Sequence, residues 1–176
     1  MRRLPLQQSA VIMAVLVFPL VACSKTDSKS SEPAPAAVPQ TPESLIQKST
    51  ELRRSGKGKE AVDTAVAAYT LARTGPRVDE RLELAKAQAA AGKSAGAINE
   101  IKQLEHEKRE QKLPVDEVSI AEVYAQIGDP NAVFRWLSRA AEAKSPKLAG
   151  VQDNKDLDPV KSDPRWADFL AGLQKK

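Results

Sequence analysis

The chain has 176 residues, of which 4% are aromatic, and a formal net charge of +4 at pH 7. Because domains commonly hold about 100–150 residues, this length leaves room for one domain and a tail, not for two domains. The scarcity of aromatic side chains favours closely packed helices over a sheet. The charge does not predict a nucleic-acid partner, because basic and acidic residues are interspersed along the charged run 102–110 instead of collecting on one face.

The first 22 residues have the organisation of a secretory signal peptide. Arg2 and Arg3 give a positive start, and the apolar run 10–22 is shorter than the roughly 20 residues that span a bilayer. The run ends in Leu20-Val21-Ala22-Cys23, which resembles the lipobox of bacterial lipoproteins. The resemblance implies that residues 1–22 are removed and that Cys23 then carries a diacylglycerol and an amide-linked fatty acid. The alternative is an ordinary signal peptide followed by an unrelated cysteine.

A lipidated Cys23 predicts a protein that is anchored to a membrane and does not span it, because two or three acyl chains give stable anchoring. Cys23 is the only cysteine, so no disulfide is expected. Ser24 follows it, and by similarity to enterobacterial sorting the absence of Asp at this position favours the outer membrane, with the protein facing the periplasm. We therefore expect a bacterial cell-envelope location.

Residues 23–41 are predicted to form a tether between the anchor and the folded domain. The stretch consists mainly of Ser, Pro, Ala and Lys and has almost no large apolar side chain. Such a composition buries too little area to offset the entropy of ordering. In the extended polyproline II form, at about 3.1 Å per residue, its residues 24–40 would reach on the order of 50 Å.

Proline and glycine then delimit a series of helices. Thr41-Pro42 is typical of a helix N-cap followed by a first-turn proline, and Asp129-Pro130 and Asp163-Pro164 repeat the pattern. Pro76 and Pro114 open two further segments. The predicted helices are 43–55, 58–73, 77–91, 94–111, 115–127 and 130–143.

A period of 36 residues runs through these helices, because Gly56, Gly92 and Gly128 are evenly spaced (92 − 56 and 128 − 92). Other columns share this register: Leu52, Gln88 and Tyr124; Ala61, Ala97 and Val133; Ala65, Ile101 and Leu137. Such self-similarity predicts stacked helix pairs, each of which buries its apolar face against its neighbours.

The columns resemble the tetratricopeptide repeat. Its small, aromatic, glycine and alanine positions correspond here to Ala85, Gln88, Gly92 and Ala97, then Ala121, Tyr124, Gly128 and Val133, and, with a serine first, Ser49, Leu52, Gly56 and Ala61. The resemblance covers 42–146 and implies an all-α fold of about three helix–turn–helix repeats in a short right-handed solenoid. Gln88 and Val133 depart from the pattern, and so does the period of 36 where 34 is usual.

Residues 147–176 are predicted to close the stack. They resemble a C-terminal module of bacterial tetratricopeptide proteins, with one Asp-Pro turn at Asp158-Pro159 and a second at Asp163-Pro164. After the second turn, the apolar residues fall at helical spacing: Trp166, Phe169, Leu170 and Leu173. We expect a short capping helix on the end of the repeats.

The sequence does not favour catalysis, and no cofactor or metal is expected. His106 is the only histidine and lies in a charged run, so no second ligand accompanies it. Asp156 and Asp158 are interpreted as turn and surface residues. Trp136, Trp166, Tyr124 and Phe134 could form an aromatic ligand cage, but each occupies a packing position, which favours a core role.

The family resemblance places a partner-binding groove on the first helices of the repeats. The corresponding residues are Ile46, Thr50, Arg53, Arg54, Leu82, Lys86, Ala89, Val118, Glu122 and Ala125. Arg53, Arg54 and Lys86 would make one end basic, which suits a peptide with an acidic terminus. Exchanging both arginines for Glu is then expected to weaken binding and leave the helices intact. The alternative is that these basic residues are merely solvated.

These features predict a lipid-anchored, periplasm-facing protein that scaffolds an envelope complex by binding another envelope protein or a peptide segment of it. The alternative is an accessory protein that binds a carbohydrate or cell-wall ligand directly. That alternative requires exposed aromatic residues, so solvent exposure of Trp136 and Trp166 would favour it.

Overall fold

The computed structural model describes residues 40–174, and these are helical with no strand among them. The predicted signal peptide, the lipidation site at Cys23 and the tether up to residue 39 lie outside the described residues. The α-helices are α1 Pro42–Arg54, α2 Gly58–Leu71, α3 Val78–Ala90, α4 Ser94–Gln111, α5 Glu117–Ile127, α6 Pro130–Glu142 and α7 Pro164–Gln174. Two 3-10 helices, η1 Pro146–Asp153 and η2 Lys155–Val160, lie between α6 and α7.

The six predicted helices are confirmed, with small differences at their ends. Thr41 caps α1 by accepting a hydrogen bond from the backbone N–H of Ser44 over 3.2 Å, and Pro42 occupies the first turn. Asp129 caps α6 in the same way. Pro114 is not in the first turn of α5, because it lies before the N-cap residue Asp116. The side chain of Asp116 accepts a hydrogen bond from the N–H of Val118. Proline therefore marks the approach to this helix, and the aspartate marks its start.

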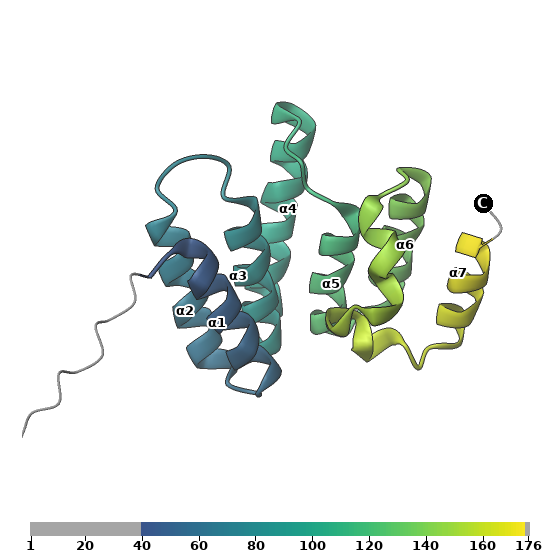
Figure 1. The fold of residues 1–176 in the computed structure, drawn as a ribbon, viewed down its shortest axis with the longest axis horizontal. Coiled ribbons are helices and arrows are strands. Elements are labelled where there is room, and N and C mark those ends of the chain that lie inside the picture. Colours follow the sequence, from purple (N-terminus) through teal and green to yellow (C-terminus); the bar gives the residue numbers. More distant parts are fainter. Residues whose placement is uncertain (1–39, 175–176) are drawn as a thin grey trace, which may run out of the picture. The chain divides into compact units, whose positions relative to one another are not determined.

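The helices form three antiparallel pairs, α1 with α2, α3 with α4 and α5 with α6, which follow one another along the chain as in a solenoid (Figure 1). Gly56, Gly92 and Gly128 end the first helix of each pair with φ of +77°, +75° and +82°. This left-handed conformation is costly for residues with a Cβ, which explains the recurrence of glycine every 36 residues (92 − 56 and 128 − 92).

Two apolar clusters stabilise the stack. The larger one runs from α3 to α7 and contains the fully buried Ile101, Ile120 and Leu137. The smaller one joins α2 to α3 and consists chiefly of small residues: Ala61, Val62, Ala65, Leu84 and Ala87. The small alanine side chains allow α2 and α3 to approach closely.

The C-terminal helix caps the last pair, as predicted. Trp166 of α7 is buried in the larger cluster, and Phe169, Leu170 and Leu173 pack against it. The guanidinium of Arg165 lies 4.5 Å from the centre of the Phe134 ring and donates to Asn131 Oδ1 of α6 over 2.8 Å. Trp136 and Trp166 are each only 7% exposed, which confirms their core role and argues against an aromatic ligand cage.

Candidate functional site: a divided groove

The first helices of the three pairs, α1, α3 and α5, lie side by side, because α1 contacts α3 and α3 contacts α5. Their shared face is where the sequence places a groove. The 3-10 helix η2 packs against α5 on this face (Figure 1). The chain's own C-terminal segment therefore fills one part of the groove and leaves another part open. We call the part that is filled by residues 154–156 the closed half, and the part that is lined by Ile46 and Leu82 the open half.

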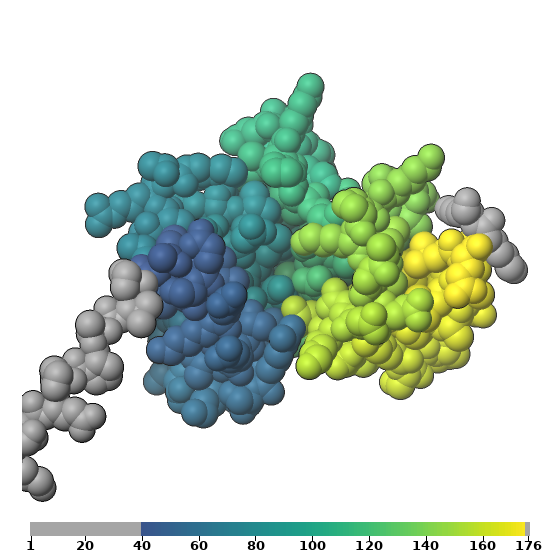
Figure 2. Space-filling model, viewed as in Figure 1, coloured from purple at the N-terminus to yellow at the C-terminus, as the bar shows by residue number. Residues whose placement is uncertain are grey.

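The open half is a pocket of about 360 Å³ on α1, α3 and α5. Its lining includes five of the predicted groove residues, Ile46, Thr50, Leu82, Lys86 and Glu122. The other described residues of the lining are Glu43, Gln47, Asp79, Glu83, Ser119 and Lys147. Figure 2 shows the surface hollowed between the dark blue atoms of α1 and the yellow-green atoms of the C-terminal segment.

Five of the ten predicted groove residues do not line the pocket: Arg53 and Arg54, which belong to the closed half, and Ala89, Val118 and Ala125. Ala89, Val118 and Ala125 are buried in the larger apolar cluster, where they pack α3 and α5 against their neighbours. The pattern that identified them is the helical spacing of small and apolar residues, which serves packing and binding equally well. Burial alone separates the two roles.

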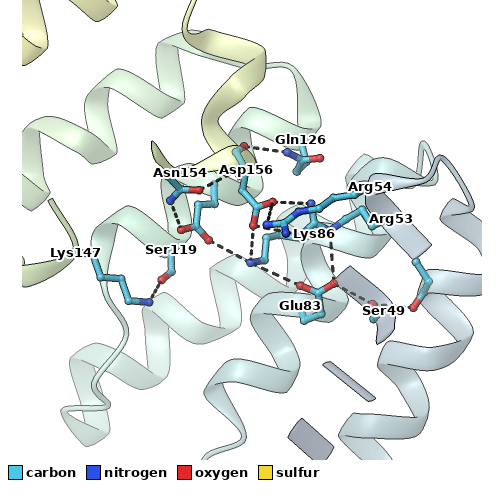
Figure 3. A network of polar contacts seen from close by, with 12 residues as sticks. Ser49, Arg53, Arg54, Glu83, Lys86, Ser119, Gln126, Lys147, Asn154 and Asp156 are labelled. Carbon is cyan, nitrogen blue, oxygen red and sulfur yellow. Dashed lines mark hydrogen bonds and ion pairs between the residues drawn. The ribbon is translucent and has the colours of Figure 1, made fainter. Parts of the chain in front are cut away.

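The closed half is built around Arg53 and Asp156, which are 103 residues apart in the sequence (Figure 3). Arg53 Nη1 donates to Asp156 Oδ1 over 2.9 Å, and Nη2 donates to Oδ2 over 3.2 Å, a two-pronged geometry that matches a guanidinium to a carboxylate. The third guanidinium contact is Nε to Glu83 Oε1 at 3.5 Å. Ser49 Oγ donates to the same Glu83 oxygen over 2.9 Å.

Lys86 lies at the centre of three carboxylates. Its Nζ is 3.1 Å from Asp156 Oδ2, 3.2 Å from Glu122 Oε2 and 3.6 Å from Glu83 Oε2. Burial alone would lower the pKa of Lys86, but the three carboxylates outweigh burial and raise it. The lysine therefore stays charged, and it belongs to both halves because it also lines the open pocket.

Helix α5 binds residues 154–156 through both main-chain and side-chain hydrogen bonds, as a binding groove binds an extended peptide. Glu122 Oε1 accepts from the side-chain amide of Asn154 over 2.8 Å, and Gln126 Nε2 donates to the main-chain carbonyl of Asp156 over 2.9 Å. Asn154 in turn accepts from the Asp156 N–H over 2.9 Å. One contact to the main chain and several to side chains fix this segment on the groove floor (Figure 3).

The cluster is balanced in charge: Arg53, Arg54 and Lys86 face Glu83, Glu122 and Asp156. Burial would raise the pKa of Asp156, but Lys86 and Arg53 outweigh burial and lower it to about 2. Arg54 is the exposed member, since 48% of its side chain is accessible against 2% for Arg53. Arg53 is therefore a buried structural residue, whereas its neighbour Arg54 is half exposed to solvent.

The hypothesis that the basic residues are merely solvated is wrong for Arg53 and Lys86. Both are enclosed, and both are paired with carboxylates of the chain itself. The interpretation of Asp156 as a turn or surface residue is also wrong, because this aspartate is buried between α1, α3 and α5. Asp158, interpreted in the same way, is exposed and pairs only with Lys161 among the described residues.

Sequence reasoning missed Asp156, Glu83 and Asn154. Glu83 lies in the continuous buried run 81–85 of α3, and this helix contacts α1, α2, α4 and α5. Because α3 has no separate polar and apolar faces, its sequence pattern does not show that the Glu83 side chain is directed toward α1. Asn154 and Asp156 lie outside the 36-residue period. The one available signal was chemical: two arginines and a lysine on a predicted inner face require acidic partners, which the chain itself could supply.

Other features of residues 40–174 do not indicate a reaction centre. Within this range, no cluster of three His, Cys, Asp or Glu side chains is arranged to hold a metal ion. None of the helices described has the length and apolarity needed to cross a bilayer. Comparison with family models, curated proteins and solved structures finds no match to this chain. The groove is therefore the feature of the described residues that points to a function.

Proposed function

We propose that this protein is a membrane-anchored interaction module of the bacterial envelope, of the tetratricopeptide type, whose open half-groove binds a segment of another envelope protein. The observation that supports this most is the pocket of about 360 Å³, which gathers residues from the first helix of all three pairs. A face built from equivalent positions of stacked repeats is a common way for such scaffolds to present an extended binding surface.

The closed half supports the same proposal, because this face already binds one peptide segment. Residues 154–156 lie on α5 through a contact to the main chain and through side-chain contacts. The open half offers comparable groups: the amide of Gln47 and the hydroxyls of Thr50 and Ser119 line it. Such groups suit the main chain of an extended segment.

Direct carbohydrate binding, the alternative considered from the sequence, lacks comparable support. Sugar sites commonly use exposed aromatic side chains, and none of the described residues that line the pocket is aromatic. Trp136 and Trp166 are buried in the core.

The lipid anchor proposed at Cys23 would keep the groove close to the membrane. A lipid-anchored domain on a tether stays near the bilayer, which raises the local concentration of the module around envelope partners. Binding, not catalysis, is the proposed mechanism, and it requires no cofactor.

Photocrosslinking in living cells tests the proposal. A photoreactive amino acid is placed at Gln47 or Thr50 in the pocket, and at the exposed Asp63 of α2 or Lys102 of α4 as controls. We expect a discrete envelope protein to be captured from the pocket positions only, and captured less in a Cys23→Ala variant, which should also leave the membrane fraction. The same adducts from all four positions, or none from the pocket, would overturn the proposal.

A further inference from the structure

The open half of the groove is acidic although the chain as a whole is basic. Its lining carries four carboxylates, Glu43, Asp79, Glu83 and Glu122, against two ammonium groups, Lys86 and Lys147. Glu83, Glu122 and Lys86 belong to the charge-balanced cluster of the closed half. The rest of the lining therefore carries −1 (1 − 2), from Lys147 against Glu43 and Asp79, whereas the chain carries +4. A field of one sign inside a concave surface favours partners of the other sign.

The two ammonium groups differ, because only Lys86 is paired with carboxylates among the described residues. Lys86 is held by three carboxylates on the groove floor. Lys147 of η1 donates to Ser119 Oγ over 2.7 Å. An acidic partner, which the sequence favoured, would have to compete with Asp156 for Arg53 and Lys86. Asp156 is fixed in place by the fully buried Leu157 that follows it.

Two of the carboxylates are available at the rim. Glu43 and Asp79 are exposed, and among residues 40–174 the ion pairs involve neither of them. They lie in the first turns of α1 and α3. The pKa of Glu43 is lowered by its backbone hydrogen bond and by the Thr41 hydroxyl, so this group stays ionised.

Apolar groups lie beside these carboxylates. Ile46, half-buried on α1, and Leu82, buried on α3, both line the pocket. An aliphatic stem that ends in a positive charge combines the two requirements, and only Lys and Arg side chains have that form. Chain 154–156, which borders the pocket through Glu122 and Lys86, shows that this face accepts an extended segment.

We infer that the open half-groove takes an extended, basic segment of its protein partner, laid next to the chain's own residues 154–156, with a Lys or Arg side chain packed on Ile46 and Leu82 and paired with Glu43 and Asp79. This inference rests on the proposed function and specifies the partner's chemistry. The side-chain amide of Gln47 and the hydroxyl of Thr50, which also line the pocket, remain for the main chain of that segment.

The experiment uses the full-length, membrane-bound protein crosslinked from Gln47, with the captured partner segment sequenced by mass spectrometry. We expect a segment containing Lys or Arg and no excess of Asp or Glu. A double variant, Glu43→Lys with Asp79→Lys, should reduce the adduct at least tenfold. The matched control, Glu60→Lys with Asp63→Lys on the exposed side of α2, should leave it unchanged. Circular dichroism should show both variants as helical as the parent.

A captured segment that is acidic or uncharged, or an adduct equally strong in the Glu43→Lys, Asp79→Lys variant, would overturn this inference and leave the interaction module in place. Absence of any pocket-specific adduct would overturn both. Because Glu43→Gln with Asp79→Asn removes the charges without adding new ones, a reduction in that variant as well would confirm attraction by the carboxylates and exclude mere repulsion by the introduced lysines.

Discussion

The two halves of the groove use the same face of the same helices in opposite ways. In the closed half, buried charges are matched within the chain, and Arg53 has its partner in Asp156. In the open half, exposed carboxylates at Glu43 and Asp79 lie beside apolar surface and have no ion pair within residues 40–174. The comparison teaches that a charged residue on an inner face indicates a binding role only after its partners within the chain are known.

Charge reversal at Arg53 should produce the largest effect. Arg53→Glu places a further carboxylate beside Glu83 and Asp156 in a buried site. Breaking a buried pair costs about 3–5 kcal/mol, which is comparable with the whole stability of a small domain at about 5–15 kcal/mol. We expect loss of helicity or a much lower urea midpoint. This corrects the expectation from the sequence that such an exchange leaves the helices intact.

Arg54→Glu is the matched control for Arg53→Glu. The adjacent side chain is half exposed and reaches Asp156 only at 3.5 Å, so its loss should cost within about 1 kcal/mol. Equal urea midpoints for the two variants would show that the closed half is not the buried network described here.

The second largest effect should be the loss of stability at acid pH, when Asp156 in the closed half becomes protonated. The folded-state pKa of Asp156 is about 2, below the ordinary 3.8, so its ionisation stabilises the fold above pH 3.8 and this contribution disappears as pH falls through about 2. The difference corresponds to about 2 kcal/mol at neutral pH. Urea unfolding of the parent and of Asp156→Asn should therefore differ by a constant amount above about pH 5 and converge below pH 4. A difference that stays constant down to pH 2.5 would contradict this assignment.

Removal of one buried hydroxyl should give a change of the same order as that caused by acid and smaller than that of Arg53→Glu. Ser49 is fully buried, and its one hydroxyl proton is shared between two acceptors, Glu83 Oε1 at 2.9 Å and the carbonyl of Ala61 at 3.1 Å. Ser49→Ala should destabilise the protein by about 1–3 kcal/mol, because the Glu83 oxygen loses a donor in a buried site. Thr50→Ala, its half-buried neighbour in the open half, is the control and should change the urea midpoint little.

The helices could be predicted from the sequence because their determinants are local. Asp129-Pro130 fixes the start of α6, and Gly128 fixes the end of α5 through its φ of +82°. Repetition of these signals at a constant interval also places the first helices side by side. As a result, Ile46, Leu82 and Glu122 were expected on one face, and the structure brings them into one pocket.

The division of the groove could not be predicted, because it depends on contacts between distant parts of the chain. The ion pair of Arg53 with Asp156 joins residues 103 positions apart, and no period connects them. Asp156 lies in the turn-rich sequence before Pro159, where an aspartate usually caps or faces solvent. Only the path of η2 across the face of α5 shows that it faces inward.

The return of residues 154–156 to α1 and α3 also limits how this architecture can grow. Repeat arrays commonly lengthen by duplicating a unit, since each unit contacts only its neighbours. Here the segment after the third pair bonds to the first pair through Arg53 and to the second through Lys86. A duplicated unit inserted after α6 would move Asp156 away from Arg53 and Lys86. Both buried cations would then lose a carboxylate partner. The contacts of Asp156 with the first and second pairs thus oppose insertion of a further helix pair after α6.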